Sequence, residues 1–295
     1  MRRCAFLTMD DPTGYTIDDD LAIGPLADVG WHVDKVSWRA RTDWDRYEAV
    51  VIRSPWDYHE TPATLDAFLG VLEGIDASTA VLLNGLHSVR WNVRKTYLRE
   101  LEAAGVPVIP TVWRERLGPG EAAGLFDAVG TDEIVVKPTL GANASGAFRL
   151  TRDVPRSAEV EAHFAGLPLM AQPFVASVVD EGEFSVFAFG GEVAHTILKT
   201  PKARDVRVQE EHGGHITAVS PEPGLLAAAQ HAFDATEAAV GEALLYARAD
   251  LVRAPADSPD GFWLIEVEVV EPALYFRMDA GAPRRFAAAF AARMG

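Results

Sequence analysis

The spacing of apolar residues in the first third of the chain predicts alternating strands and helices. Short aliphatic runs are bounded by polar residues, and the stretches between them have apolar residues three or four positions apart. We predict strands at 4–9, 32–38, 48–54 and 80–84, with helices around 20–30 and 62–75. This order is typical of βαβ units, so we expect a small doubly wound parallel sheet whose ligands gather at the carboxyl ends of its strands.

The pattern changes after residue 91. A helix is predicted from 92 to Gly105, followed by a strand into Pro110, and two later strands are joined at Gly190 and Gly191 like a hairpin. The other predicted elements are a strand that carries Lys137, a strand within 167–176, an alanine-rich helix around 224–247, and strands at 246–254 and 261–272. Because no repeat or flexible linker is visible, we expect these regions to pack against one another.

The strand predicted at 261–272 carries carboxylates among apolar residues that are typical of a protein core. Side chains alternate along a strand, so Glu266 and Glu268 point to the same face, with Cα atoms about 6.5 Å apart. Two buried like charges repel and lose hydration, so such a pair needs protonation, cationic partners or a metal. The alternative is a half-exposed antiparallel strand with its polar face in water.

The composition argues against nucleic-acid and membrane partners. The chain of 295 residues has 27 basic and 43 acidic residues, a net charge of −16, and no long basic run, so we expect no nucleic-acid partner. No apolar stretch reaches the ~20 residues of a membrane span, and Cys4 is the only cysteine, which excludes an internal disulfide. We therefore expect a soluble, cytoplasmic protein without a membrane partner. The phosphate-binding pattern G-x-x-x-x-G-K-[ST] is absent.

Six segments in order nevertheless resemble a nucleotide-dependent family. They are VVKPTLGANASG, AQPFV, GEFSV, DVRVQEEHGG, ADLV and IEVEVVEP. With Lys95 before them, this series resembles the ATP-grasp ligases over residues 92–279. The resemblance implies an α/β protein with the ATP-grasp fold. It places a Rossmann-like substrate domain at 1–91, a central lid domain at 92–171 and a C-terminal domain with metal ligands at 172–295.

The resemblance assigns nucleotide binding to residues in several of these segments. Two lysine ammonium groups would meet α- and β-phosphate oxygens, and a loop of small residues would let backbone N–H groups approach the phosphates. The segment 172–175 would bind adenine through its backbone, and an acid would bind the ribose. The residues concerned are Lys95, Lys137, Gly141, Ser145, Gly146, Gln172, Pro173, Phe174, Val175, Glu183 and Gln209.

The resemblance also implies metal ligands and catalytic cations. Asp250, Glu266 and Glu268 match the family's magnesium ligands, and we expect two Mg²⁺ ions that keep both glutamates ionised. Arg207 would reach the γ-phosphate. Peptide-forming relatives have an arginine where this chain has Ser185. Either Lys199 or Lys202 would replace it, and Lys199 is our catalytic assignment.

Within the family, one subgroup is similar in four segments, which are RSPWDYH, RWNVRKTYL, DVRVQEEHGGH and IEVEVVEP. On these segments the chain most resembles the cycloserine-forming ligases. That similarity implies that O-ureido-D-serine is activated by ATP at its carboxylate and cyclised to D-cycloserine, with release of ADP, phosphate, carbon dioxide and ammonia. The amino-acid-like substrate would contact Arg53, Asp57, Arg90 and Glu271. Three alternatives stay open: a two-substrate carboxylate-amine ligase of the glutathione-synthetase or dipeptide type, a non-catalytic nucleotide-binding protein, and a structural α/β protein. A homodimer also stays open.

Overall fold

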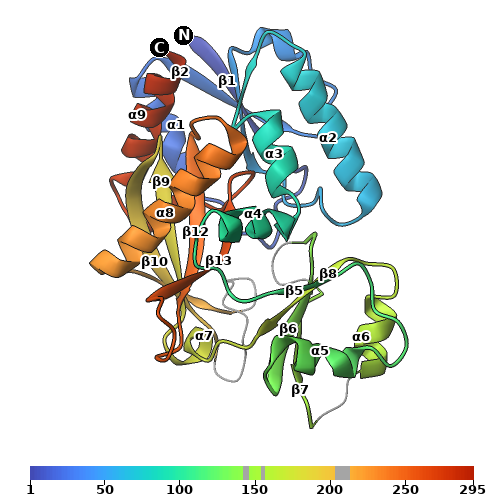
Figure 1. Cartoon of the computed structure of the whole chain (residues 1–295). Helices are drawn as coiled ribbons and strands as arrows, with labels where there is room; N and C mark the ends of the chain where they lie inside the picture. The colour runs from blue at the N-terminus through green and yellow to red at the C-terminus, as the bar shows by residue number, and fades with distance from the viewer. Residues whose placement is uncertain (142–145, 154–156, 203–212) are drawn as a thin grey trace.

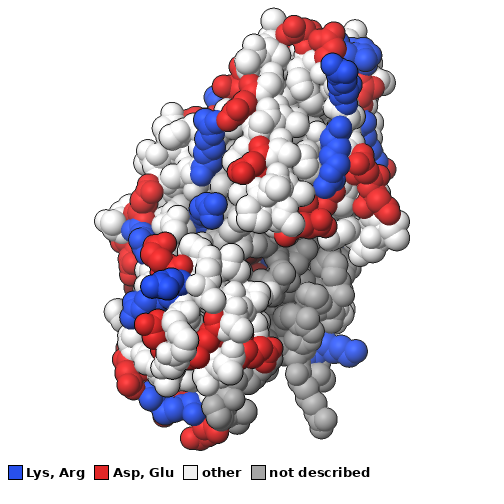
Figure 2. All heavy atoms as spheres, turned by 90° about the vertical axis from the view of Figure 1, so that its right-hand side faces the viewer, with Lys and Arg blue, Asp and Glu red and all other residues white. Residues whose placement is uncertain are grey.

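The computed structural model describes residues 1–141, 146–153, 157–202 and 213–295. The described chain contains three β-sheets with helices packed around them, and the N- and C-termini lie close together at one end (Figure 1). Within these ranges, every helix is too short or too polar to cross a bilayer. On the face shown in Figure 2, acidic and basic side chains are interspersed.

The first sheet is parallel, as predicted. Its strands β1 (Arg2–Thr8), β2 (Trp31–Ser37), β3 (Ala49–Ser54) and β4 (Val81–Leu83) lie in the order β2-β1-β3-β4. The connections between strands contain the 3₁₀ helix η1 (Asp19–Ala22), α1 (Ile23–Asp28), the 3₁₀ helix η2 (Trp44–Arg46) and α2 (Pro62–Asp76). Helix α2 begins where predicted because Thr61 caps it and Pro62 follows as its first residue.

The second sheet is antiparallel and, like the first, has four strands. It consists of β5 (Val112–Arg114), β6 (Glu133–Pro138), β7 (Phe148–Thr151) and β8 (Leu169–Pro173), in the order β5-β8-β6-β7. Helices α5 (Ala122–Val129) and α6 (Ser157–His163) pack against it around a core that includes Ile134 and Val136. Lys137 lies next to Val136 on β6, so its side chain leaves the other face of the strand.

The third sheet contains the strand with the paired glutamates. Its antiparallel strands are β9 (Glu183–Phe189), β10 (Glu192–Thr200), β11 (His215–Ala218), β12 (Tyr246–Arg253) and β13 (Phe262–Glu268), in the order β11-β10-β9-β12-β13. Alternate residues of β9 and β12 pack on α8 (Pro223–Val240), which lies across one face (Figure 1). The opposite face holds Phe187 and Phe189, which pack toward α9 (Ala282–Met294).

Several predicted elements differ in the structure. The helix predicted from 92 to Gly105 is divided among the end of α3 (Leu86–Asn92), the 3₁₀ helix η3 (Lys95–Tyr97) and α4 (Leu98–Ala103), and the strand predicted at 261–272 is β13, which ends at Glu268. The alanine-rich helix ends at Val240 rather than at 247, because Gly241 adopts a left-handed conformation with φ 68° and closes the helix. The strand predicted into Pro110 is reduced, among the described residues, to a single parallel bridge between Val108 and Leu264. Pro107 and Pro110 flank that bridge, and proline lacks the N–H that a continuing ladder needs.

Packing joins the sheets across the predicted domain boundaries. Leu98 and Leu101 on α4 (Leu98–Ala103) belong to the same core as α8 and the third sheet, although they lie in the range predicted as the lid domain. At the other end, Phe286 of α9 meets Phe6 edge-on with 6.4 Å between ring centroids, which ties the C-terminal helix to the first sheet. The boundaries at 91/92 and 171/172 stay predictions.

Candidate active site

Three carboxylates meet on the face of the third sheet that is opposite α8. Asp250 on β12 pairs in register with Glu266 on β13, and Glu268 follows two residues later on the same face. One ligand atom from each of the three residues lies within 4.8 Å of the others. The alternation that we expected for Glu266 and Glu268 therefore holds, and the neighbouring strand adds Asp250. Oxygen ligands at this spacing fit a hard divalent cation.

A buried arginine that the sequence analysis missed binds two of these carboxylates. Nε and Nη2 of Arg248 donate to Asp250 Oδ1 and Oδ2 over 3.0 and 2.9 Å, and Nη2 also donates to Glu268. Arg248 precedes Asp250 by two residues on β12, so both side chains leave the same face of the strand. The alternation used for the two glutamates could have found Arg248.

Lys199 approaches the same cluster from β10. Its Nζ lies 2.8 Å from Glu183 Oε1 and 3.3 Å from Asp250 Oδ1, and its side chain is buried. The Ser185 hydroxyl also donates to Asp250. The ammonium thus reaches the carboxylate beside Ser185, whereas Lys202 is exposed. This geometry favours Lys199 over Lys202 as the residue that supplies the missing positive charge.

The two lysines assigned to the nucleotide lie on different elements. Lys95 begins the 3₁₀ helix η3 (Lys95–Tyr97), where its Nζ is 2.5 Å from Glu266 Oε2 and its backbone N–H donates to the Thr139 carbonyl over 2.7 Å. Lys137 lies on β6, and burial lowers the pKa of its ammonium to about 8. The charge of Glu266 raises the pKa of Lys137 and that of Lys95 lowers it, so both lysines lie near Glu266.

The protein's own cations stabilise the two glutamates unequally. Burial by itself would raise the pKa of Glu266, but Lys95 and Lys137 outweigh this effect and hold the pKa well below its usual range. Burial raises the pKa of Glu268 to about 8, against the opposing charge of Arg248, and the neighbouring Glu266 adds to the increase. Ionisation of both glutamates at neutral pH, as we expected, therefore requires a further cation, which a divalent metal would supply.

The segment assigned to adenine joins the second sheet to the third. The side chain of Gln172 donates to Thr111 Oγ1 over 2.9 Å, and Pro173 ends β8. The Phe174 ring lies 3.7 Å from the Arg149 guanidinium carbon, and Val175 is buried against Val252. Gly141 and Gly146 flank the assigned lid loop. Ser145, Arg207 and Gln209 lie outside the described residues, so their roles stay predictions.

The four residues assigned to the substrate have different surroundings. Arg53 is fully buried and donates to Asp19 Oδ1 over 3.0 Å and to the Pro272 carbonyl over 2.9 Å. Asp57 accepts from Trp38 Nε1 over 2.7 Å and pairs with Arg39. Glu271 accepts from the Tyr58 hydroxyl over 2.8 Å. The structure brings Glu271 near the cluster, because Lys95 lowers the pKa of Glu271 and the charge of Glu271 raises the pKa of Glu268.

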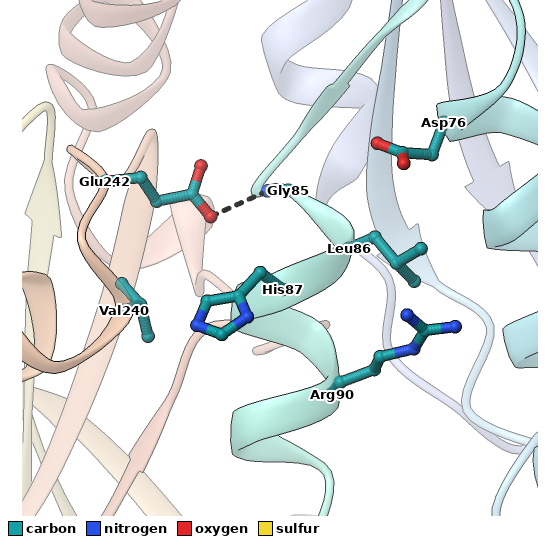
Figure 3. A pocket seen from close by; sticks show the side chains of 7 residues that line it. All are labelled: Asp76, Gly85, Leu86, His87, Arg90, Val240 and Glu242. Atoms are coloured by element: carbon teal, nitrogen blue, oxygen red, sulfur yellow. Dashed lines mark hydrogen bonds between the residues drawn. The ribbon is translucent and has the colours of Figure 1, made fainter.

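Arg90 lies instead at a separate surface pocket of about 420 Å³ (Figure 3). It is on α3 (Leu86–Asn92) and pairs with Glu73 on α2. The carboxylate of Glu242 accepts from the Gly85 N–H over 3.1 Å at the start of the same helix. None of the three clustered carboxylates lines this pocket. A substrate contact by Arg90 stays a prediction that this arrangement does not favour.

Comparison with known proteins identifies the chain's relatives. Residues 4–84 match the family described as the N-terminal domain of D-cycloserine synthetase DcsG. The chain is 33% identical over 301 residues to the cycloserine biosynthesis protein DcsG of Streptomyces lavendulae, covering 96% of this chain and 97% of that protein. The chain belongs to the DcsG family. The crystal structure of D-cycloserine synthetase DcsG matches this DcsG-family chain with a TM-score of 0.85 and 31% identity, covering 99% and 100% of the two chains.

More distant structures share the fold of this DcsG-family protein. The ATP-grasp ligase PsnB, solved with a minimal precursor, Mg and ADP, matches with a TM-score of 0.66 and 15% identity over 99% of this chain and 97% of PsnB. The predicted ATP-grasp fold is confirmed, and the protein is an ATP-dependent ligase. Because a ligase is an enzyme, the alternatives of a non-catalytic nucleotide-binding protein and of a structural α/β protein are excluded.

Proposed function

We propose that this DcsG-family ligase cyclises O-ureido-D-serine to D-cycloserine with consumption of ATP. The observation that carries the proposal is the full-length relationship to the cycloserine biosynthesis protein, which includes the N-terminal domain as well as the ATP-grasp sheets. The N-terminal domain matters because the carboxyl ends of its strands face the loop after β13 through Arg53 and Tyr58. In a parallel sheet, that edge is where ligands bind.

The carboxylate cluster would hold Mg²⁺ for the nucleotide. Asp250, Glu266 and Glu268 offer three oxygen ligands within 4.8 Å, and the raised pKa of Glu268, about 8, indicates a carboxylate that lacks sufficient positive charge around it. Mg²⁺ held by these three carboxylates would offset the negative charge of the ATP phosphates. Lys137 would add an ammonium from the second sheet. We expect two Mg²⁺ ions to bind at this cluster.

The reaction would proceed in three stages. The substrate carboxylate attacks the γ-phosphorus of ATP, which forms an acylphosphate and releases ADP. The ureido nitrogen bound to oxygen then attacks the acyl carbon, which closes the ring and expels phosphate. Water finally hydrolyses the carbamoyl group to carbon dioxide and ammonia. Because nucleophile and electrophile belong to one molecule, the enzyme would have to hold a single substrate in a folded conformation rather than align two.

The deciding experiment measures ADP release with Mg-ATP. O-ureido-D-serine alone is compared with single amino acids and with amino-acid pairs, and products are identified by mass spectrometry. ADP release with the ureido compound alone, together with the mass of cycloserine, is the expected result. Turnover that requires two different substrates would instead establish a carboxylate-amine ligase of the peptide type and overturn the proposed cyclisation.

A further inference from the structure

Among the described residues, five acidic side chains surround the candidate active site, and four of them contact a cation. Asp250 contacts Arg248 and Lys199, Glu183 contacts Lys199, Glu266 contacts Lys95, and Glu268 contacts Arg248. The fifth is Glu271. Among the residues that the structure describes, no lysine, arginine or histidine nitrogen lies within ion-pair distance of its carboxylate.

Glu271 is held in place by the segment that follows β3. The Trp56 indole N–H donates to the Glu271 carbonyl over 2.9 Å, and the Tyr58 hydroxyl donates to Glu271 Oε1 over 2.8 Å. Arg53 donates to the next carbonyl, that of Pro272. Tyr58 itself is fixed because its ring stacks on Phe68 with 4.4 Å between centroids. These donors occupy the backbone and one carboxylate oxygen, and no donor among the described residues contacts Oε2.

The surroundings of this carboxylate favour a positively charged partner. Burial raises the pKa of Glu271 to about 7, although the Tyr58 hydroxyl and the charges of Lys95, Arg248 and Arg53 oppose the increase. A hydroxyl supplies one neutral hydrogen bond, whereas an ammonium would supply charge and a second donor. Glu271 is half-buried, and a carboxylate in this situation gains from binding a cation.

We propose that Glu271, positioned by Tyr58 and Trp56, binds the α-ammonium group of the substrate. This inference rests on the proposed function and deepens it, because it assigns the amine-recognising residue. The α-amino nitrogen is two bonds from the carboxylate carbon that must reach the phosphate site. The acid that binds the amine must therefore lie beside the metal cluster without belonging to it. Glu271 meets this requirement three residues beyond Glu268.

The test compares two substrates that differ in the amine alone. O-ureido-D-serine is compared with 3-(carbamoylaminooxy)propanoic acid, which keeps the carboxylate and the ureido nitrogen. We expect the wild-type enzyme to prefer the amine-bearing compound in kcat/KM, and Glu271→Gln to reduce kcat/KM for that compound about 10- to 100-fold. The same variant should change kcat/KM for the des-amino compound less than about 3-fold, because the lost contact is absent there.

Two further variants keep the result decisive. Tyr58→Phe retains the stacked ring and removes the hydroxyl, so it should reduce the preference for the amine less than Glu271→Gln does, and it replaces that variant if Glu271→Gln fails to fold. Glu48→Gln changes an exposed acid that pairs with Arg2 and should behave like the wild type. An equal loss for both substrates, or no preference in the wild type, would overturn the proposal.

A binding measurement separates this proposal from the proposed reaction. If O-ureido-D-serine is not turned over, the cyclisation is wrong, and calorimetry with D-serine and 3-hydroxypropanoate in the presence of Mg²⁺ and a non-hydrolysable ATP analogue then tests the ammonium site. Tighter binding of D-serine that Glu271→Gln abolishes supports the site. Equal binding of the two compounds, or no binding of D-serine, overturns it.

Discussion

Lys199 and Glu183 lie opposite each other on β10 and β9, and their side chains form a buried ion pair with 2.8 Å between Nζ and Oε1. The same ammonium lies 3.3 Å from Asp250 Oδ1, so one lysine compensates two buried acids. The side chain of Lys199 is 4% exposed and that of Asp250 is 1% exposed, which leaves little solvent to replace the lysine. Removal of the lysine would therefore leave uncompensated charge inside the sheet that carries the candidate active site.

Replacing this lysine should destabilise the fold. We expect Lys199→Met to lower the free energy of unfolding by about 3–5 kcal/mol, because it leaves two buried carboxylates without their shared cation. Urea denaturation followed by circular dichroism measures the change. Lys202→Met is the matched control, since that exposed side chain should contribute less than about 0.5 kcal/mol. A loss below about 1 kcal/mol for Lys199→Met would show that the pair is not compensating buried charge.

Removing one metal ligand should change the requirement for magnesium. Glu268→Gln keeps the side-chain shape and leaves Arg248 paired with Asp250, so the fold should persist. We expect the Mg²⁺ concentration for half-maximal ADP release to rise at least about 10-fold, because one anionic ligand is lost. Asp257→Asn, at an exposed loop acid, serves as the control. An unchanged magnesium requirement would exclude Glu268 as a ligand, and ADP release that continues in excess chelator would exclude the metal site itself.

The lysine on β6 should act on the nucleotide. Lys137→Ala is expected to raise the Kd for ATP about 10- to 100-fold, because a charge-assisted contact to phosphate is lost. Calorimetric titration with ATP and Mg²⁺ measures the Kd. Lys35→Ala is the control, because it removes a surface lysine that pairs with exposed Asp20 and should leave the Kd unchanged. ATP binding that survives Lys137→Ala unchanged would remove Lys137 from the nucleotide site.

A buried histidine should make stability depend on pH. Burial lowers the pKa of His195 to about 4, although its hydrogen bond to the Leu274 carbonyl opposes the decrease. Between pH 6.5 and about 4 the unfolded chain binds a proton that the folded chain does not, so stability falls as the pH falls. Across this pH range, the protonation of His195 lowers the free energy of unfolding by about 3 kcal/mol.

The contribution of His195 is measured as a difference between variants. Urea denaturation at pH 7, 6 and 5 is compared for the wild type and His195→Phe, and the variant should lose less stability on acidification. His231→Asn, at an exposed position on α8, should follow the wild type. Parallel pH curves for the wild type and His195→Phe would show that the histidine is not held neutral by the fold.

Local patterns predicted most of the elements and the shared face of two glutamates, whereas the family resemblance implied the other residues of the candidate site. The alternation of side chains placed Glu266 and Glu268 on one face of a strand, and the order of strands and helices predicted the parallel first sheet. Both inferences depend on backbone geometry alone, which is the same wherever a strand occurs. Helix α8 was predicted too long because the alanine-rich spacing continues past Gly241, whose left-handed conformation ends the helix.

Tertiary structure decided which side chains meet. Tyr58 and Glu271 are 213 positions apart, and nothing in the local pattern around either residue indicates the other. Arg53 looks like a substrate-binding cation in the sequence, yet it is fully buried and bound to Asp19 and a backbone carbonyl. The sequence by itself determined which faces are apolar and which segments carry carboxylates. The partners of those carboxylates depend on how separate sheets pack, because burial and distance arise only when the whole chain has folded.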